Sequence, residues 1–340
     1  MTRLLVVGAG AMGRRHAALI GAHPQLTLAG FVDPSPPRAA FPGTPSWPDI
    51  ASVTAEVDGA VIATPNADHA ASGIACAARG WPILVEKPIA STLGEAEALI
   101  TAAEAARVPL LVGHHRRHHP AAGAARSLIA AGAIGRLVGV EALWALRKPD
   151  AYFAGAWRTS AGGGPVLLNL IHEIDLLRHL AGEIVEVAAL TSAATRGGAV
   201  EDTAALALRF QGGALGTVLL SDAALSPWAW EAATGENPAI AHSGRDSWRL
   251  SGTEGALAFP SLTLWRYEGE GEANWSRPLS SFDLSAGPGE ALALQLDHFR
   301  AVILGEAEPL VSGRDGLATL RATLAVHASA RTGAAIRLGD

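Results

Sequence analysis

The chain has 340 residues, 49% of them hydrophobic, and a formal net charge of −6; it has enough apolar residues for the cores of two domains, and its acidic balance argues against nucleic acid or an anionic membrane as a partner. Cys76 is the single cysteine, which excludes an intramolecular disulfide and a cysteine-based zinc site. The first apolar segment starts at residue 3 and none approaches membrane-spanning length, so we expect a cytoplasmic protein without a signal peptide.

A glycine-rich loop follows the first predicted strand, residues 3–7, and precedes a helix predicted over residues 14–22. In the order strand, G-x-G-x-x-G and helix, Gly8 allows a tight turn, Gly10 allows a pyrophosphate to approach the backbone, and Gly13 allows close helix–strand packing. The helix start, at Ala11 and Met12, presents N–H groups to phosphates. The loop therefore predicts dinucleotide binding; the alternative is an ordinary tight turn before a helix. Arg14 can reach a phosphate, whereas Arg15 and His16 are expected at the surface.

Asp33 follows the second predicted strand, residues 26–32. Its carboxylate can accept both ribose hydroxyls of NAD and would repel the additional phosphate of NADP. Arg38 lies just beyond and can offset that repulsion. NAD is therefore the expected cofactor, and NADP is the less favoured alternative.

Strands and helices alternate up to about residue 120. Strands are predicted over residues 60–63, 83–85 and 110–112, and helices over residues 67–79 and 93–106, the latter opened by a capping box at Thr92 and Glu95. This pattern predicts an α/β Rossmann domain over residues 1–120, with a doubly wound parallel sheet that binds ligands at the carboxyl ends of its strands. Three groups follow such ends: Thr64-Pro65-Asn66 with His69, Glu86-Lys87-Pro88, and residues 113–120.

His69 and the other residues after residue 63 are expected along the nicotinamide half of the cofactor. Pro65-Asn66 is also an ordinary turn pair, and an exposed histidine at a helix start is the alternative for His69. Burial of a lysine ammonium group at the end of a buried strand, as at Lys87, costs free energy, which favours a chemical role for this residue. Glu86 is expected near the cofactor, where it orients Lys87 or caps the strand end.

After residue 120 the predicted strands become longer and more often adjacent. They cover residues 137–146, 184–193, 203–210, 214–221, 247–252, 256–259 and 262–266, with helices at 165–180, 290–304 and 313–331 and a hairpin turn at 211–213. Residues 121–340 are therefore predicted to form an α+β domain with a largely antiparallel open sheet for substrate binding and oligomerisation. Its exposed sheet face favours a homo-dimer or tetramer. Residues 226–244 are predicted to form a loop that can close on substrate.

A histidine lies in the helix predicted over residues 165–180. Asn169 and Asp175 lie three residues on either side of His172, within reach of one helix face. A histidine flanked in this way has a partner that fixes its tautomer and a route for proton exchange. The alternative is a core histidine bonded to backbone.

Taken together, the motifs resemble the Gfo/Idh/MocA family, which includes glucose-fructose oxidoreductase and inositol dehydrogenase. The resemblance covers nearly the whole chain and adds Trp157-Arg158, Gly162-Gly163-Gly164 and Gly252-Thr253-Glu254-Gly255 to the segments above. It implies a two-domain, oligomeric, nicotinamide-dependent oxidoreductase that acts on polyols, sugars, cyclitols or related alcohols. Lys87 and His172 fall on the family's catalytic lysine and histidine, and Arg117, Trp157 and Arg158 match positions near the substrate; interdomain packing is the alternative for these three.

One position departs from the family pattern. Relatives of inositol dehydrogenase often carry an aspartate four residues before the catalytic histidine, where this chain has Leu168. Asn169 can take over an orienting or substrate-binding role, but an amide cannot relay a proton. A strict inositol dehydrogenase is therefore not expected.

The expected mechanism places two groups on one hydroxyl. His172 removes the proton of a secondary alcohol as hydride passes to nicotinamide, and Lys87, as ammonium, stabilises the developing charge on oxygen. Two other classes remain open: a non-catalytic NAD(P)-binding sugar sensor, and a glycosidase-like enzyme that uses NAD transiently. No metal is expected at His114-His115-Arg116-Arg117-His118-His119, because arginines repel cations and the run has no clear carboxylate companion.

Overall fold

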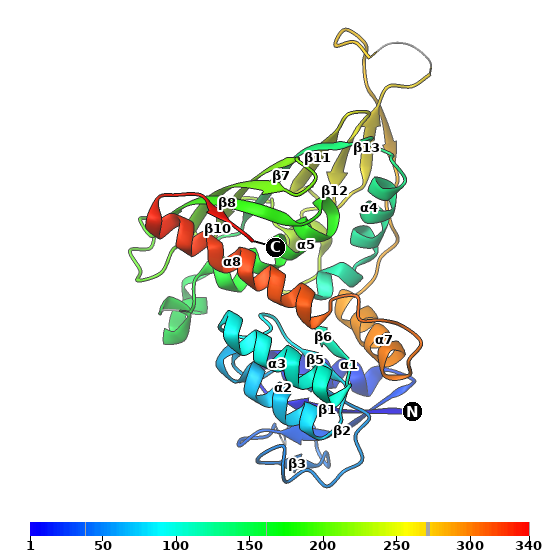
Figure 1. Ribbon diagram of the computed structural model, residues 1–340, viewed down its shortest axis with the longest axis vertical. Coiled ribbons are helices and arrows are strands. Elements are labelled where there is room, and N and C mark those ends of the chain that lie inside the picture. Colours follow the sequence, from blue (N-terminus) through cyan, green and yellow to red (C-terminus); the bar gives the residue numbers. More distant parts are fainter. Residues whose placement is uncertain (38, 161, 270–272, 340) are drawn as a thin grey trace. The chain divides into compact units, whose positions relative to one another are not determined.

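The computed structural model describes residues 1–37, 39–160, 162–269 and 273–339, without the side chains of residues 156 and 157. The chain divides into two compact units, Met1–His115 with Ala291–Leu320, and Arg116–Glu290 with Arg321–Asp340 (Figure 1). The sequence indicated one boundary at residue 120, whereas the structure returns Ala291–Leu320 to the first unit. That segment belongs there because α7 (Ala291–Ile303) contacts α1 (Ala11–Ala22) and Ser312 forms a β-bridge with Leu111.

The first unit contains a six-stranded parallel sheet in the order β3-β2-β1-β4-β5-β6. Its strands are β1 (Thr2–Val7), β2 (Leu26–Val32), β3 (Ser46–Trp47), β4 (Gly59–Ile62), β5 (Ile83–Val85) and β6 (Leu110–Val112). All residues of β4, β5 and β6 are buried, as expected for parallel strands covered on both faces. The predicted Rossmann sheet is confirmed, and its strand order reverses between β1 and β4, where such folds bind ligands.

Helices connect these strands. A 3-10 turn at Asn66–Asp68 leads into α2 (His69–Ala78), and α3 (Leu93–Ala106) follows β5. The predicted capping box is present, because the Thr92 hydroxyl accepts from the Glu95 N–H at 3.2 Å and the Glu95 carboxylate accepts from the Thr92 N–H at 3.0 Å. The short strand β3 was not predicted.

The second unit contains a nine-stranded sheet in the order β14-β13-β12-β11-β7-β10-β9-β8-β15. Its strands are β7 (Leu137–Ala145), β8 (Ile184–Ser192), β9 (Thr203–Phe210), β10 (Leu215–Ser221), β11 (Trp248–Gly252), β12 (Ala256–Phe259), β13 (Thr263–Arg266), β14 (Ser280–Asp283) and β15 (Ile336–Arg337). Adjacent strands pair antiparallel except β7 and β10, which are parallel. The largely antiparallel sheet is thus confirmed, with one parallel pair and two unpredicted edge strands, β14 and β15.

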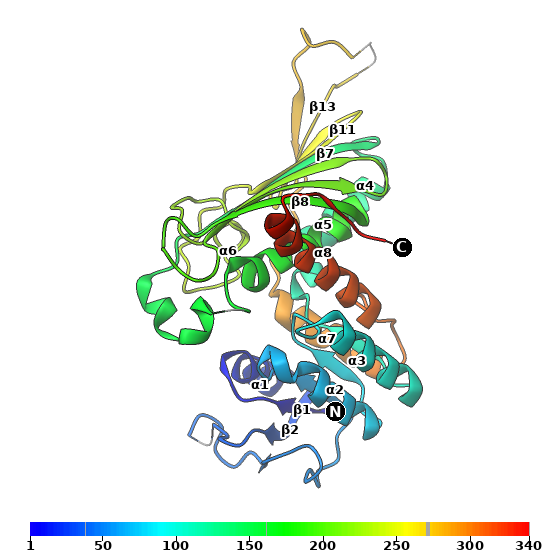
Figure 2. The ribbon, with the colours of Figure 1, turned by 60° about the vertical axis from the view of Figure 1, so that its left-hand side comes forward.

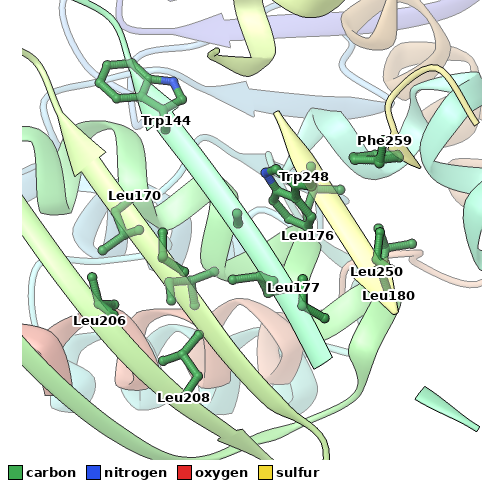
Figure 3. Packing of buried hydrophobic residues seen from close by; sticks show 14 of the residues in the cluster. Trp144, Leu170, Leu176, Leu177, Leu180, Leu206, Leu208, Trp248, Leu250 and Phe259 are labelled. Carbon is green, nitrogen blue, oxygen red and sulfur yellow. The ribbon is translucent and has the colours of Figure 1, made fainter. Parts of the chain in front are cut away.

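One face of this sheet carries the core. Along β9, exposed residues alternate with buried Ala204, Leu206, Leu208 and Phe210. Leu176 and Leu180 of α5 (Ile171–Ala181) lie near Trp248 and Leu250, as Figure 3 shows. The part of α8 (Gly313–Thr332) that belongs to this unit lies on the same face (Figure 2). The sheet and these two helices therefore form a two-layer arrangement.

The remaining helices differ from the predictions. The helix α4 (Pro120–Ala130) was missed, and α6 (Trp230–Thr234) lies inside the segment predicted to be a loop. The helix predicted over residues 165–180 begins instead as a π-helical turn, Val166–Leu170, before α5. Among the helices that the structure describes, none combines the length and the apolar character needed to cross a bilayer.

Candidate functional site

The three glycines of the nucleotide loop have different surroundings. Gly8 has φ +93°, and a Cβ there would lie 2.6 Å from the backbone oxygen of Ala63. A Cβ on Gly13 would lie 1.9 Å from the carbonyl oxygen of Gly8, whereas one on Gly10 would meet no atom within 4 Å. Gly8 and Gly13 are therefore required by the protein's own packing, and Gly10 leaves open space where a ligand can approach the backbone.

The start of α1 is suited to an anion. Gly10 is its N-cap and provides no side-chain cap, and the first N–H groups of a helix have no intrahelical acceptor. Gly10 and Ala11 are exposed, and Met12 is half-buried. The segment thus fits the pyrophosphate of a dinucleotide. Arg14 donates to the Ala9 carbonyl at 2.9 Å, which places its guanidinium beside the loop.

Asp33 directly follows β2 beside this loop. Its carboxylate accepts from the Ala9 N–H and from the Ser35 N–H, each at 2.7 Å. These two bonds fix the carboxylate orientation while the side chain remains half-buried. This position fits a ribose-binding carboxylate. Arg38 lies outside the residues that the structure describes.

His69 connects two of the loops that follow the parallel strands. Its Nδ1 lies 2.7 Å from the Pro88 carbonyl oxygen, and its Nε2 lies 3.0 Å from that of Thr64. The side chain is only 1% exposed, so the alternative of a surface histidine is wrong. His69 therefore ties the segment Thr64-Pro65-Asn66 to the segment that contains Lys87.

Glu86 has a buried partner that sequence reasoning missed. The Nε2 atom of His16 lies 2.7 Å from Glu86 Oε1, and His16 is completely buried rather than at the surface. Gly13, His16, Ala17 and Ile20 form the buried face of α1, and this i, i+3, i+4, i+7 spacing could have revealed it.

The charge of Glu86 is stabilised despite its burial. Burial alone would raise its pKa, but the hydrogen bond and charge of His16, with the charges of His115 and Lys87, hold the pKa well below its usual range. Gly113 permits this packing, because a Cβ there would lie 3.0 Å from Glu86 Cα. Glu86 is therefore an anion next to Lys87.

In the second unit, His172 lies in the first turn of α5 and is 7% exposed. Both carboxylate oxygens of Asp175 accept from Arg117, at 2.8 Å from Nε and 2.7 Å from Nη2. This bidentate pair holds the predicted residues Arg117 and Asp175 together and fixes both side chains. The π-helical turn before α5 changes the angles between Leu168, Asn169 and His172 from those of a continuous α-helix.

Asn169 contacts a residue that the sequence reasoning did not identify. Its Oδ1 accepts from Lys148 Nζ at 2.6 Å, and Lys148 Nζ lies 3.6 Å from Asp222 Oδ2 and 4.6 Å from the ring centroid of Tyr152. Burial lowers the pKa of Lys148, although the charges of Asp222 and Glu231 oppose this. The signal was present in the composition, because Lys87 and Lys148 are the only lysines of the chain.

A cavity of about 220 Å³ opens in the second unit. Its charged wall residues are Asp150, Arg158, Arg196, Glu201 and Asp222, and Gly164 also lines it. Arg158 donates to the Tyr152 carbonyl at 2.8 Å and stacks on the Tyr152 ring. The structure therefore places Arg158 at this cavity. The backbone of Trp157 belongs to the 3-10 helix Ala156–Thr159, but its side chain is not among those that the structure describes.

Arg116, from the histidine-rich run, forms a buried network. It donates to Glu173 and, at 2.7 Å, to Glu231. The indole N–H groups of Trp248 and Trp144 donate to the same two carboxylates. Burial raises the pKa of Glu173 to about 7, and the nearby charge of Glu231 adds to this effect while Arg116 opposes it. Within the described ranges, no cluster of three or more histidine, cysteine or acidic side chains is arranged to hold a metal ion.

Known proteins match both halves of the chain. Residues 2–114 match the model of an oxidoreductase family with an NAD-binding Rossmann fold, and residues 123–258 match the GFO/IDH/MocA C-terminal domain. The 1,5-anhydro-D-fructose reductase of Ensifer adhaerens is 31% identical over 297 residues, covering 83% of this chain and 80% of the reductase.

Two further matches cover more of the chain. The inositol 2-dehydrogenase of Rhizobium meliloti is 27% identical over 330 residues, covering 94% of this chain and 93% of that protein. The crystal structure of the WlbA dehydrogenase from Bordetella pertussis with NADH and UDP-GlcNAcA has a TM-score of 0.79 and 25% identity, covering 99% of this chain and 98% of that one.

Proposed function

The chain belongs to the GFO/IDH/MocA family of oxidoreductases, and we propose that it transfers a hydride between a secondary alcohol of a sugar, cyclitol or related compound and the nicotinamide of NAD. The relatives named above act on 1,5-anhydro-D-fructose and on inositol, which supports a polyol or sugar-like substrate. The proposal rests on the exposure of Lys87. It is the only residue from 83 to 90 that is not buried, so a fixed segment holds its ammonium group where a substrate oxygen can reach it.

Lys87 and His172 divide the work at the reacting hydroxyl. A bound nicotinamide supplies the hydride acceptor. Neutral His172 takes the hydroxyl proton, and the Lys87 ammonium holds the oxygen and stabilises the negative charge that develops on it. In the reductive direction the same pair polarises a carbonyl and returns the proton. Arg117 and Asp175 stabilise the helix that carries His172, and Asn169, Trp157 and Arg158 contact the substrate.

NAD is the proposed cofactor. The residues that would hold it are Gly8, Gly10, Ala11, Met12, Gly13, Asp33, Thr64, Pro65, Asn66, His69 and Glu86, the last two acting through the loops that they hold. The orientation of Asp33 supports NAD over NADP, because its fixed carboxylate would repel a ribose phosphate.

We also propose a cytoplasmic homo-oligomer, a dimer or tetramer. The sheet face opposite the core exposes Leu190, Leu215 and Leu219, and exposed apolar surface of this kind favours association. The buried free thiol of Cys76 is compatible with a reducing compartment. Light scattering during gel filtration tests the association; a monomer at micromolar concentration would reject it.

A cofactor-reduction screen tests the proposed activity. Cyclitols, aldoses, sugar acids and their 1,5-anhydro or deoxy relatives are offered with NAD and, in parallel, with NADP. The expected result is NADH formation with at least one polyol or sugar. NAD binding without turnover of any compound would instead support a sensor, and tightly retained cofactor without net NADH would support transient use of NAD.

A further inference from the structure

Lysine is almost absent from this chain. Of 26 lysines and arginines, only Lys87 and Lys148 are lysines. Arginine is planar and forked, whereas lysine is a compact point charge on a flexible stem, so the two do not substitute for each other in tight sites. Lys87 has a role in the proposed chemistry. Lys148 is a buried ammonium group, which is costly, and the proposed chemistry gives it no role.

Lys148 is buried at one end of the nine-stranded sheet. It follows β7 and is 8% exposed, with its ammonium 5.7 Å from the ring centroid of Trp144 and 4.6 Å from that of Tyr152. Its polar partners are Asn169 Oδ1 at 2.6 Å and Asp222 Oδ2 at 3.6 Å. An ammonium group offers only donors, so Lys148 can engage only an oxygen of Asn169.

The contact with Lys148 fixes the orientation of the Asn169 side-chain amide. With Oδ1 held by Lys148, the amide NH₂ group points elsewhere, and no residue within the described ranges accepts from it. Asn169 is half-buried and lies three residues before His172. With its oxygen turned toward Lys148, Asn169 offers its two N–H donors beside the helix turn that carries His172.

We propose that Lys148 is a positioning residue for substrate specificity, which holds Asn169 as a hydrogen-bond donor to a substrate oxygen. This role rests on the proposed function, because the oxygen belongs to the alcohol substrate or its ketone product. A freely rotating amide could offer either a donor or an acceptor at the same point. The Lys148 contact removes that choice and selects substrates with an oxygen at this position.

The neighbouring cavity indicates an uncharged substrate. Its walls carry Arg158 and Arg196 against Asp150, Glu201 and Asp222, so three carboxylates face two guanidinium groups, and Lys148 beside Asp222 brings the sum to zero. Arg196 is already bound to Asp222 at 3.0 Å. Without an excess of positive charge, the wall favours a neutral polyhydroxylated ligand over a sugar acid or sugar phosphate.

A double-mutant cycle tests the positioning role. The variants are Lys148→Met, Asn169→Ala, their combination, and Arg314→Met as a control that removes an exposed arginine. The probe is whichever of myo-inositol, scyllo-inositol and 1,5-anhydro-D-fructose the wild type turns over with the highest kcat/KM. Each single variant should lose roughly tenfold or more in kcat/KM, mainly through KM, with NAD affinity unchanged. The combination should lose no more than the single variants.

Additive losses, or an unchanged kcat/KM in Lys148→Met, would overturn the role of Lys148. The variant Asn169→Asp separates a lost donor from a folding defect, because it keeps an oxygen for Lys148 but has no N–H group. It should lose as much activity as Asn169→Ala. A readout independent of turnover uses lysine labelled with ¹³C at the ε carbon, which gives two lysine signals. Asn169→Ala should shift the Lys148 signal and leave that of Lys87 in place.

The two proposals fail separately. No turnover of any polyol or sugar would reject the proposed function, and near-normal turnover in Lys87→Met would remove Lys87 from its mechanism. In both cases the ¹³C shift still decides whether Asn169 holds Lys148. An unmoved Lys148 signal would reject the positioning role even where Lys87→Met is inactive.

Discussion

The imidazole of His16 lies 2.7 Å from the carboxylate of Glu86, and both side chains are almost completely buried. The contact joins α1, which starts at the nucleotide loop, to the end of β5, where Lys87 is presented. A buried carboxylate is costly, and removal of its hydrogen-bond partner leaves its charge without compensation. His16 therefore matters chiefly because Glu86 is ionised beside it.

The variant His16→Leu should be strongly destabilised. The variant leaves the buried Glu86 without its hydrogen-bond partner. Urea unfolding at neutral pH should therefore give a free energy of unfolding about 3–5 kcal/mol below that of wild type. His23→Leu is the matched control, because His23 also lies 2.7 Å from a carboxylate, that of Asp297, which is exposed to solvent. Its cost should stay below about 1 kcal/mol. Equal costs in the two variants would refute the role of burial.

Acid should remove the contribution of Glu86. Its pKa lies below the ordinary value of 4.5 in the folded protein, so the unfolded chain takes up this proton first. The stabilisation is complete above pH 4.5 and is lost as pH falls below that value. The difference in unfolding free energy between wild type and Glu86→Gln should therefore shrink at acidic pH. A difference that stays constant would contradict an ionised Glu86.

Glu173 should give the opposite pH dependence. Its pKa is raised from 4.5 to about 7, so between these values the folded protein holds a proton that the unfolded chain has released. Lowering the pH through this window should stabilise wild type relative to Glu173→Gln by about 1–3 kcal/mol. Urea unfolding of both proteins at pH values from about 5 to about 8, which cover most of this window and extend above it, measures the difference. No change in the difference would mean that Glu173 is ionised throughout.

Two glycine variants should separate cofactor binding from folding. Gly10→Ala places a Cβ in open space, so its stability should stay within about 1 kcal/mol of wild type, but NAD affinity should fall because the Cβ occupies the approach to the backbone. Gly13→Ala places a Cβ 1.9 Å from the Gly8 carbonyl oxygen, so it should lose stability as well as NAD binding. Thermal unfolding and NAD titration of each variant are the measurements. Normal NAD affinity in Gly10→Ala would place the pyrophosphate elsewhere.

Asp33→Ser should change cofactor preference. Loss of the carboxylate removes charge-assisted hydrogen bonds to the ribose, worth about 1.5–3 kcal/mol, and the repulsion of a ribose phosphate. The NAD over NADP ratio of kcat/KM should fall by roughly tenfold or more. Steady-state kinetics with both cofactors measure the ratio. A wild type that already prefers NADP would contradict the role given to Asp33.

Local patterns predicted the elements that form the cofactor half of the site. The order strand, glycine loop and helix, and the capping box at Thr92, depend on residues adjacent in sequence, and the structure contains all of them. The helix α4 was missed because its alanine-rich sequence has few polar residues to mark one face. The π-helical turn at Val166–Leu170 has no periodicity signal of its own.

The partners of the site residues were harder to predict because they are distant in sequence. Glu86 is 70 residues from His16, and Asn169 is 21 residues from Lys148. Hydrophobic periodicity can show that a side chain such as His16 is buried, but not which polar group it meets. Pairing of this kind depends on strand order and on the ends of strands, which only the folded sheet brings together.

In the proposed mechanism, Lys87 and His172 act together on the substrate hydroxyl. NADH formation by wild type, Lys87→Met and His172→Ala, on the best substrate of the screen and with NAD binding measured in parallel, tests it most directly. Each variant should bind NAD like wild type and turn over at least roughly a hundredfold more slowly. Near-normal turnover in either variant would contradict the claim and remove that residue from the mechanism.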